Sequence, residues 1–258
     1  MFMTRLAAWG LACVLTQAST ASQQQSTPQR DAEGFAVLEQ SMAAASFAPT
    51  GATGANGTLA RGSISWADGR SGSITIESKG ASLRHEISLP GQQIVHVISA
   101  GQGYSILDGN RTPLPLWITK YQRSEHIPAL SRIADYTQPN TNIAYLGVQD
   151  VNGNPAHHIR LSSLPMDSTP QDLEDRISEF HVYIDVNSSL VLKTLGFLFS
   201  PEAMENRSTL ETYYSDYRRV GSFLVPFHMS RFLSGHKYCE ITFTSVDTAV
   251  TVPDSDFQ

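Results

Sequence analysis

The residues whose types suggest chemistry lie close together near the C-terminal end of the sequence. Asp216, Arg218 and Arg219 fall within one alternating run, "YYSDYRRV", and His228 follows in the next run, "FLVPFHMSRF". A carboxylate near a histidine can perform general acid–base catalysis, and an arginine can bind a carboxylate or a phosphate. Asp216 has no histidine near it in sequence. In a strand it shares a face with Arg218, where a cross-strand ion pair is the simpler interpretation.

The eight histidines raise the question of a metal site. His157 and His158 are neighbours, so in a strand they point to opposite faces and cannot bind the same ion. His181, His228 and His236 are far apart in sequence, and only tertiary structure could bring them together. We therefore predict neither a metal site nor a cofactor.

Other catalytic and metal-binding motifs are incomplete. No G-x-S-x-G motif occurs, and in "RHEISLP" Leu89 occupies the position where a zinc-binding helix needs its second histidine. The run "DVNGNPAHHIRL" resembles a calcium loop, but Pro155 replaces the required glycine and Leu161 replaces the bidentate glutamate. The acidic residues of 172–179 form a helical charge run, which we interpret as a solvated face rather than as paired catalytic carboxylates.

Composition favours a single exported domain. The chain has 258 residues, a formal net charge of −6 and 41% hydrophobic residues, which suits one globular unit. The mild acidity disfavours nucleic acid as a partner, because binding it requires concentrated lysine and arginine. Cys239 is in phase with apolar neighbours in "KYCEITFTSV", so we expect it to be a small buried side chain.

The N-terminal segment has the pattern of a secretory signal peptide. Arg5 precedes an apolar run at 6–15 that is too short to span a bilayer, and small residues precede a cleavage site after Ala21. Lipoprotein processing at Cys13 is the alternative.

Three segments follow from this pattern. We predict a signal peptide at residues 1–21, a disordered glutamine-rich tether at 22–30 and a single domain at 31–258. An exported chain whose mature form has one cysteine fits a bacterial periplasm better than an animal secretory route.

Alternation with a period of two dominates the domain from Thr58 onward, and turn sequences such as "DGN", "NGN" and "SGH" separate the runs. Many short strands joined by hairpins predict one large antiparallel meander. "DAEGFAVLEQSMAAAS" predicts one amphipathic helix with Asp31 as its N-cap, and "PALSRIADY" and "PQDLEDRISEF" are weaker helix patterns.

The predicted strands have an apolar face that these few helical turns cannot cover fully. The predicted fold is therefore mainly β (α+β): a curled antiparallel sheet of about eleven strands that forms a half-open barrel capped by short helices. A plain closed core is the other interpretation. Pro226 supports incomplete closure, because proline cannot donate to a ladder and marks a bulge or an edge. The candidate ligand-binding wall of the barrel consists of Ile64, Trp66, Ile74, Ile76, Phe180, Val182, Ile184, Phe223, Val225 and Phe227.

A set of short motifs in the C-terminal half carries a family resemblance. "YID" at 183–185 precedes a turn and the strand "LVLK", and "YSDY" at 214–217 precedes Gly221, Pro226 and the terminal Phe257. In this order the motifs resemble the periplasmic lipoprotein-carrier superfamily with the LolA/LolB-like fold, as a divergent member. The resemblance implies an eleven-stranded half-barrel with an apolar cavity for acyl chains, and it implies no catalysis.

The sequence therefore predicts an exported, non-catalytic protein that binds the acyl chains of a lipid or a lipidated protein, with transient membrane contact. Two alternatives stay open. One is an envelope sensor or scaffold of the same fold that binds a polypeptide through its sheet edge or loops. The other is an envelope hydrolase.

Overall fold

The computed structural model describes residues 27–46, 57–99, 102–115, 118–119, 131–165, 169–200 and 206–258. The predicted signal peptide and most of the predicted tether thus lie outside the described residues. None of the helices that are described is long and apolar enough to cross a membrane.

Thirteen strands form one sheet in the order β6-β5-β4-β3-β2-β1-β13-β12-β11-β10-β9-β8-β7. Neighbouring strands are antiparallel throughout. The strands are β1 (Gly57–Trp66), β2 (Ser71–Lys79), β3 (Ser82–Leu89), β4 (Gln92–Ser99), β5 (Gln102–Leu107), β6 (Asn110–Pro113), β7 (Thr141–Val151), β8 (Asn154–Ser163), β9 (Phe180–Asp185), β10 (Val191–Phe199), β11 (Arg207–Val220), β12 (Phe223–Leu233) and β13 (His236–Val250). The sheet has thirteen strands where the sequence predicted about eleven, and the exposed four-residue β6 has no apolar alternation that would predict it.

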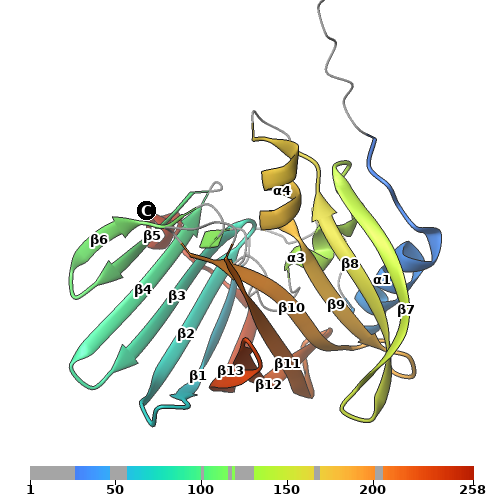
Figure 1. Cartoon of the computed structure of the whole chain (residues 1–258). Coiled ribbons are helices and arrows are strands. Elements are labelled where there is room, and N and C mark those ends of the chain that lie inside the picture. Colours follow the sequence, from blue (N-terminus) through green and yellow to red (C-terminus); the bar gives the residue numbers. More distant parts are fainter. Residues whose placement is uncertain are drawn as a thin grey trace, which may run out of the picture.

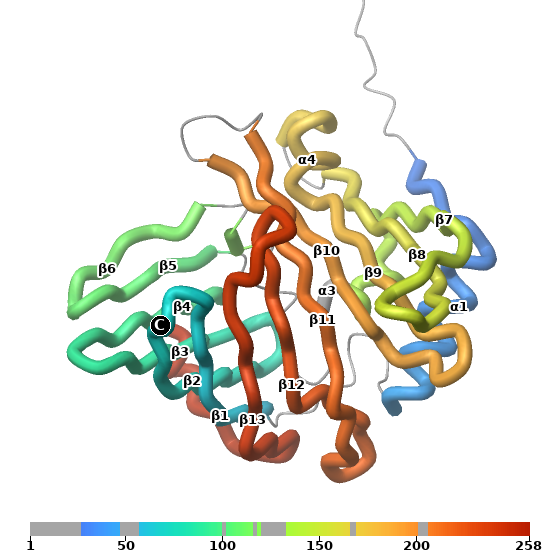
Figure 2. The backbone as a smooth tube through the Cα atoms, turned by 60° about the horizontal axis from the view of Figure 1, so that its bottom comes forward, coloured from blue at the N-terminus to red at the C-terminus, as the bar shows by residue number. Residues whose placement is uncertain are grey.

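The sheet is curled and does not close on itself. Figure 1 shows β1–β6 as one wing and β7–β10 as the other, and Figure 2 shows β11–β13 between them. The chain builds this shape as two meanders, β1–β6 and β7–β13, which meet where β1 pairs with β13. The predicted curled antiparallel sheet is therefore confirmed.

The helices lie near the concave side of the sheet. Helix α1 (Ala32–Ala44) begins at the predicted N-cap, where the Asp31 carboxylate accepts hydrogen bonds from the backbone N–H groups of Glu33 and Gly34. The shorter α3 (Ser131–Ala134) and α4 (Gln171–Ser178) fall within the two weaker helix patterns. Figure 1 shows α3 between the wings and α1 beside β7.

The pairing of β12 with β13 is interrupted near Pro226. The register between β12 and β13 runs from His228 to Leu233, so Phe223–Phe227 lies outside it and pairs with β11 alone. Pro226 lies in this half-paired segment, where its missing N–H costs no ladder bond. β12 lies inside the sheet, so the expected bulge or edge takes the form of a strand segment that lacks its β13 partner.

The "YSDY" motif departs from simple alternation. Asp216 has a φ of 54°, in the left-handed region, and it is the residue that the β11–β12 register skips. Alternation predicted opposite faces for Tyr214 and Tyr217, yet both pack against the same core cluster. Each also bonds to β10: the Tyr217 hydroxyl donates to the Val191 carbonyl, and the Tyr214 hydroxyl lies 3.1 Å from Thr194 Oγ1. The two tyrosines of the motif thus connect β11 to β10.

Gly62 sits where the two meanders join, at a register shift between β1 and β13. A Cβ at this position would lie 2.2 Å from the Thr242 carbonyl oxygen and 2.8 Å from Phe243 Cα. Both are backbone atoms of β13, so the clash cannot be relieved by turning a side chain.

We predict that Gly62→Ala destabilises the protein by about 1–3 kcal/mol, because the two strands must separate to admit the methyl group. Urea denaturation measures the free energy of unfolding. Ser63→Ala, at the exposed neighbouring position, is the matched control and should unfold like the wild type. Equal stability of both variants would show that the β1–β13 contact is not tight.

Candidate functional site

The ten residues of the predicted wall come together on the concave face. Eight are buried members of one hydrophobic cluster, and Trp66 and Phe223 are partly buried and pack against it. They come from β1, β2, β9 and β12, so strands of both wings and of the centre contribute. The structure thus groups the predicted residues, and ligand binding by them stays a prediction.

Helices share this wall with the strands. Val37, Leu38 and Met42 of α1 and Ile133 of α3 belong to the same cluster as the wall residues. Gly34 of α1 lets the helix approach β7, because a Cβ there would lie 2.9 Å from Ile143 Cγ2. The apolar face of the sheet is therefore partly covered by the protein's own helices.

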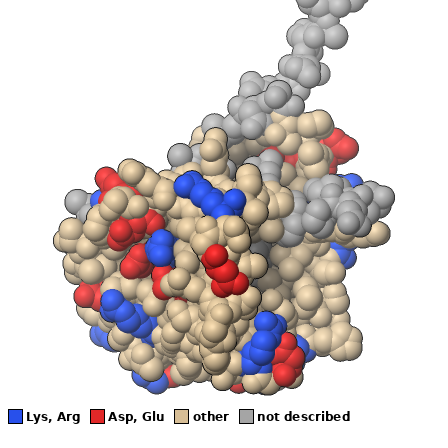
Figure 3. Space-filling model, turned by 90° about the vertical axis from the view of Figure 1, so that its left-hand side faces the viewer, with Lys and Arg blue, Asp and Glu red and all other residues tan. Residues whose placement is uncertain are grey.

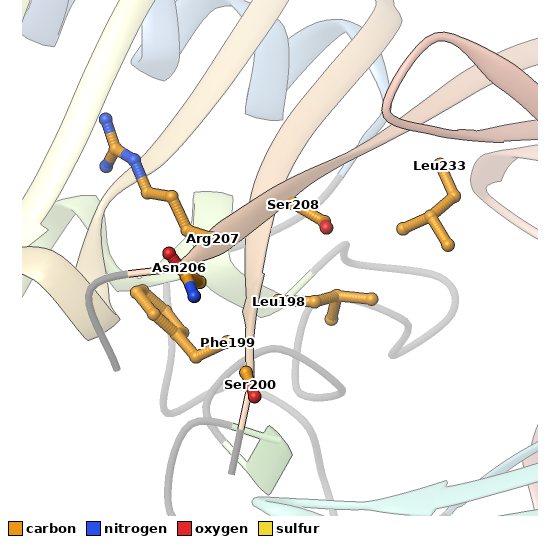
Figure 4. A pocket seen from close by; sticks show the side chains of 7 residues that line it. All are labelled: Leu198, Phe199, Ser200, Asn206, Arg207, Ser208 and Leu233. Carbon is orange, nitrogen blue, oxygen red and sulfur yellow. The ribbon is translucent and has the colours of Figure 1, made fainter. Parts of the chain in front are cut away.

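A pocket of about 500 Å³ lies at the end of the β10–β11 hairpin. Strand register places Leu198, Ser208 and Leu233 on the concave side, because Leu198 pairs with Ser208, and Leu210, two residues along β11, pairs with Leu233. Figure 4 shows the side chains of Leu198 and Leu233 on one side of the strand ends, while the Arg207 side chain extends away from them. We call this the rim pocket; its lining is Leu198, Phe199, Ser200, Asn206, Arg207, Ser208 and Leu233.

A row of polar side chains crosses the concave face near the rim pocket. Thr194 pairs with Thr212, and Thr212 pairs with Arg231, so all three point to the same side. Their exposed fractions are 4%, 4% and 6%. Sequence reasoning missed this row, although Arg231 is in phase with the wall residues Val225 and Phe227 and that period was visible. We call Thr194, Thr212, Tyr214 and Arg231 the polar row.

A second polar group lies on the convex face. The Glu179 carboxylate bonds to His181 Nε2 at 3.0 Å and to the Arg207 guanidinium at 2.8 Å. His181 Nδ1 lies 2.7 Å from His158 Nε2, and the His158 ring stacks on Tyr183 with centroids 4.2 Å apart. The tertiary structure therefore joins two histidines that the sequence analysis kept separate.

The surroundings of this group shift two pKa values. Burial, and then electrostatic interactions with His181, Lys193 and Arg160, lower the pKa of His158 to about 4. The hydrogen bond from His181, helped by Arg207, lowers the pKa of Glu179 to about 2. Both shifts stabilise the forms seen at neutral pH, a neutral His158 and an ionised Glu179.

The other chemically suggestive residues do not assemble into one site. Asp216 and Arg218 form a two-point ion pair within one strand, at 2.6 and 3.0 Å, and both are exposed. The Arg219 guanidinium donates to the Ser222 carbonyl, and His228 Nδ1 lies 3.0 Å from Ser215 Oγ. Within the described part of the chain, no three His, Cys, Asp or Glu residues are placed to share a metal ion.

Two further expectations can be compared with the structure. Cys239 is 1% exposed, which confirms it as a buried apolar side chain. The acidic run in and after α4 is less uniform than predicted. Glu174 is 5% exposed, and Glu179 enters the convex-face group, so the interpretation of a wholly solvated face is wrong. Both acids follow the packing of α4 and β9 against β8, which helical charge pattern alone does not reveal.

Surface charge is mixed on the side of the molecule that Figure 3 shows. Lysine and arginine are interspersed there with aspartate and glutamate, between larger areas of other residues. A continuous basic surface of the kind that nucleic acid requires is not present on that face.

Comparison with known proteins finds similar structures, whereas comparison by sequence finds no match. No family model matches the chain, and no curated protein matches it. A domain named as an outer membrane lipoprotein-sorting protein, from Vibrio parahaemolyticus, superposes with a TM-score of 0.52 at 11% identity and covers 88% of this chain and 96% of its own. This chain shares the fold of that domain.

A second solved structure has the same extent of similarity. A DUF1329 family protein from Desulfovibrio piger superposes with a TM-score of 0.53 at 10% identity, with 88% of this chain and 96% of that chain covered. At such identities the likeness concerns the fold. The resemblance that the C-terminal motifs suggested is thereby confirmed at the level of the fold.

The convex-face group makes stability depend on pH in two windows. The unfolded chain protonates histidine near pH 6.5, whereas folded His158 does so only near pH 4, so stability should fall as the pH drops between these values. Glu179 adds a second loss as the pH falls from about 4.5 towards 2.

We predict that His158→Phe reduces the slope of the free energy of unfolding against pH in the first window. The substitution removes a group that, in this window, is protonated only in the unfolded chain. The slope should fall by up to about 1.4 kcal/mol per pH unit, the value for one proton. Urea denaturation from pH 7 to pH 4 measures this slope, and its extension to pH 2 measures the lower window. Glu179→Gln should instead flatten the lower window. Slopes unchanged in both variants would contradict the assigned protonation states.

Proposed function

We propose that this protein is an exported, non-catalytic protein that binds the acyl chains of a lipid or a lipidated protein on its concave wall. The observation that carries the proposal is the large hydrophobic cluster on the concave face of an unclosed thirteen-stranded sheet, beside which the two other clusters of the described residues are small. An antiparallel sheet of this size that served only as a scaffold would be expected to pack that face against a second sheet. The shared fold of a protein named for lipoprotein sorting adds support.

The energetics suit long or multiple acyl chains. Burying ten methylene groups contributes about 8 kcal/mol at about 0.8 kcal/mol per group. Association itself costs on the order of 4 kcal/mol or more. A short chain would therefore bind weakly, whereas two or three long chains would bind tightly without many polar contacts.

The proposal also places the protein in the bacterial periplasm. It combines the predicted signal peptide of residues 1–21 with one structural domain at 31–258 behind a short tether. A carrier in this compartment would contact membranes transiently when it exchanges cargo.

A polypeptide partner is the second candidate, because one sheet edge carries apolar side chains. β7 ends the sheet, and Leu146 and Val148 are 43% and 55% exposed there. The N-terminal segment covers only part of this edge, through hydrogen bonds of Gln29 and Asp31 with Ile143. The remaining edge could accept an extended segment of an envelope protein.

Native mass spectrometry of protein purified from cells separates the two candidates. We predict adducts with the mass of acyl lipids or of a lipidated protein, which are lost after denaturation and refolding. Protein that carries no adduct, but retains a polypeptide through β7 and loses it on Leu146→Lys, would support the second candidate and contradict the first.

We also predict that Trp66→Asp abolishes lipid uptake, because it places a charge on the concave wall. Burying an unpaired carboxylate costs several kcal/mol, which exceeds the gain from a few methylene groups. Binding of a fluorescent lipid measures the effect. Tyr238→Asp is the matched control, since Tyr238 is 43% exposed beside Cys239, the residue opposite Trp66. Binding that is unchanged in both variants would show that the ligand does not bind at this wall.

A further inference from the structure

The apolar concave wall contains a buried cation. Arg231 is 6% exposed and follows the wall residues of β12 in phase, two residues after the buried Met229. Burying a charged group in apolar surroundings is costly unless oppositely charged or hydrogen-bonding groups meet it. Arg231 already makes contacts within the protein, and its charge adds an attraction for anionic groups that a wholly apolar wall would lack.

Hydroxyl side chains lie beside Arg231 on the β11 side of the same face, and Cys239 is its partner on the β13 side. Thr212 is its direct partner on β11, where paired Cβ atoms lie about 4.5–5.5 Å apart. Thr194 is the next residue across the sheet, and its Oγ1 lies 3.1 Å from the Tyr214 hydroxyl. All four residues of the polar row are at most 7% exposed.

The polar row lies between the rim pocket and the aliphatic part of the wall. Towards the rim, Leu233 follows Arg231 on the same side and lines the pocket. In the other direction, Tyr214 pairs with Met229, Met229 with Ile241, and Ile241 with Ile64, so the next row is mostly apolar. The polar row is thus a narrow polar band on an otherwise apolar face, with Leu233 on its rim side and Met229 and Ile241 on the other.

We propose that Arg231 and the polar row bind the oxyanion head group of an acyl ligand, either a carboxylate or a phosphate. This inference rests on the proposed function and specifies its ligand class. The guanidinium group matches both oxyanions, because its planar fork donates two parallel hydrogen bonds. It has five donors, so an oxyanion can be added to the contacts that Arg231 already makes.

The test compares three single-chain probes that each have about sixteen carbons. At this length the free energy gained by burying the chain exceeds the cost of association. They are hexadecanoate, hexadecyl phosphate and hexadecan-1-ol, each titrated to displace the neutral fluorophore N-phenyl-1-naphthylamine. We expect the wild type to bind one or both anions at least about tenfold more tightly than the alcohol, which corresponds to about 1.4 kcal/mol. The two anionic arms distinguish a carboxylate site from a phosphate site.

Three variants test whether Arg231 causes the preference for the anionic probes over the alcohol. Arg231→Met should remove it and leave alcohol binding intact, and Arg231→Lys should retain part of it, because the charge stays while the fork is lost. Arg207→Met is the matched control. Arg207 also lines the rim pocket but bonds to Glu179 of the convex-face group, so its loss should leave the ratio of anion to alcohol affinity unchanged.

The outcomes separate the two proposals. Equal affinities for all three probes in the wild type would overturn the head-group site while leaving acyl binding in place, and this result needs no variant to fold. A preference that survives in Arg231→Met, or disappears in Arg207→Met, would also overturn it. Failure of the wild type to bind the fluorophore and every probe would overturn both the site and the proposed function.

Discussion

A large sheet with one apolar face and no second sheet has to cover that face by other means. Here the thirteen strands curl, so that the wings approach one another, and α1 and α3 add side chains to the space between them. The free energy gained by removing apolar surface from water stabilises this arrangement, yet short helices cover less area than a sheet would. The concave face is therefore covered by helices and by the curl of the sheet itself rather than by a second sheet.

Local backbone features make the curl possible. The two meanders meet at β1 and β13, where Gly62 permits a close approach of two strands. Pro226 lies where β12 has separated from β13, and Asp216 adopts a left-handed conformation opposite that segment. A flat, regular ladder would require none of these exceptions. Their concentration around β11–β13 places the irregularity at the centre of the sheet, between the two wings.

The two faces of the sheet carry their polar groups for different reasons. On the convex face, Glu179, His181 and Arg207 bond to one another, so the group is self-contained and contributes to stability at neutral pH. On the concave face, Arg231 and its neighbouring hydroxyls interrupt an apolar wall. Polar residues within an apolar surface reduce the affinity for a purely apolar ligand, and they are retained most readily where the ligand itself has a polar end.

Much of the fold could be predicted from the sequence because its signals are local. The period of two gave the strands, Asp31 gave the start of α1, and Pro226 indicated the interrupted pairing. The ten wall residues could be named for the same reason, since alternation alone decides which side chains share a face of one strand. The short strand β6 was missed because four exposed residues have no apolar alternation to reveal them.

What only the tertiary structure decided was the register between neighbouring strands. The contact between His158 and His181 and the row of Thr194, Thr212 and Arg231 both depend on register across strands. Register is set by turns, by the packing of a whole face and by single exceptions such as Asp216, and no local pattern in the sequence encodes it. The sequence by itself determined a curled sheet with an apolar side, whereas the polar chemistry on each face arose from the register in which neighbouring strands pair.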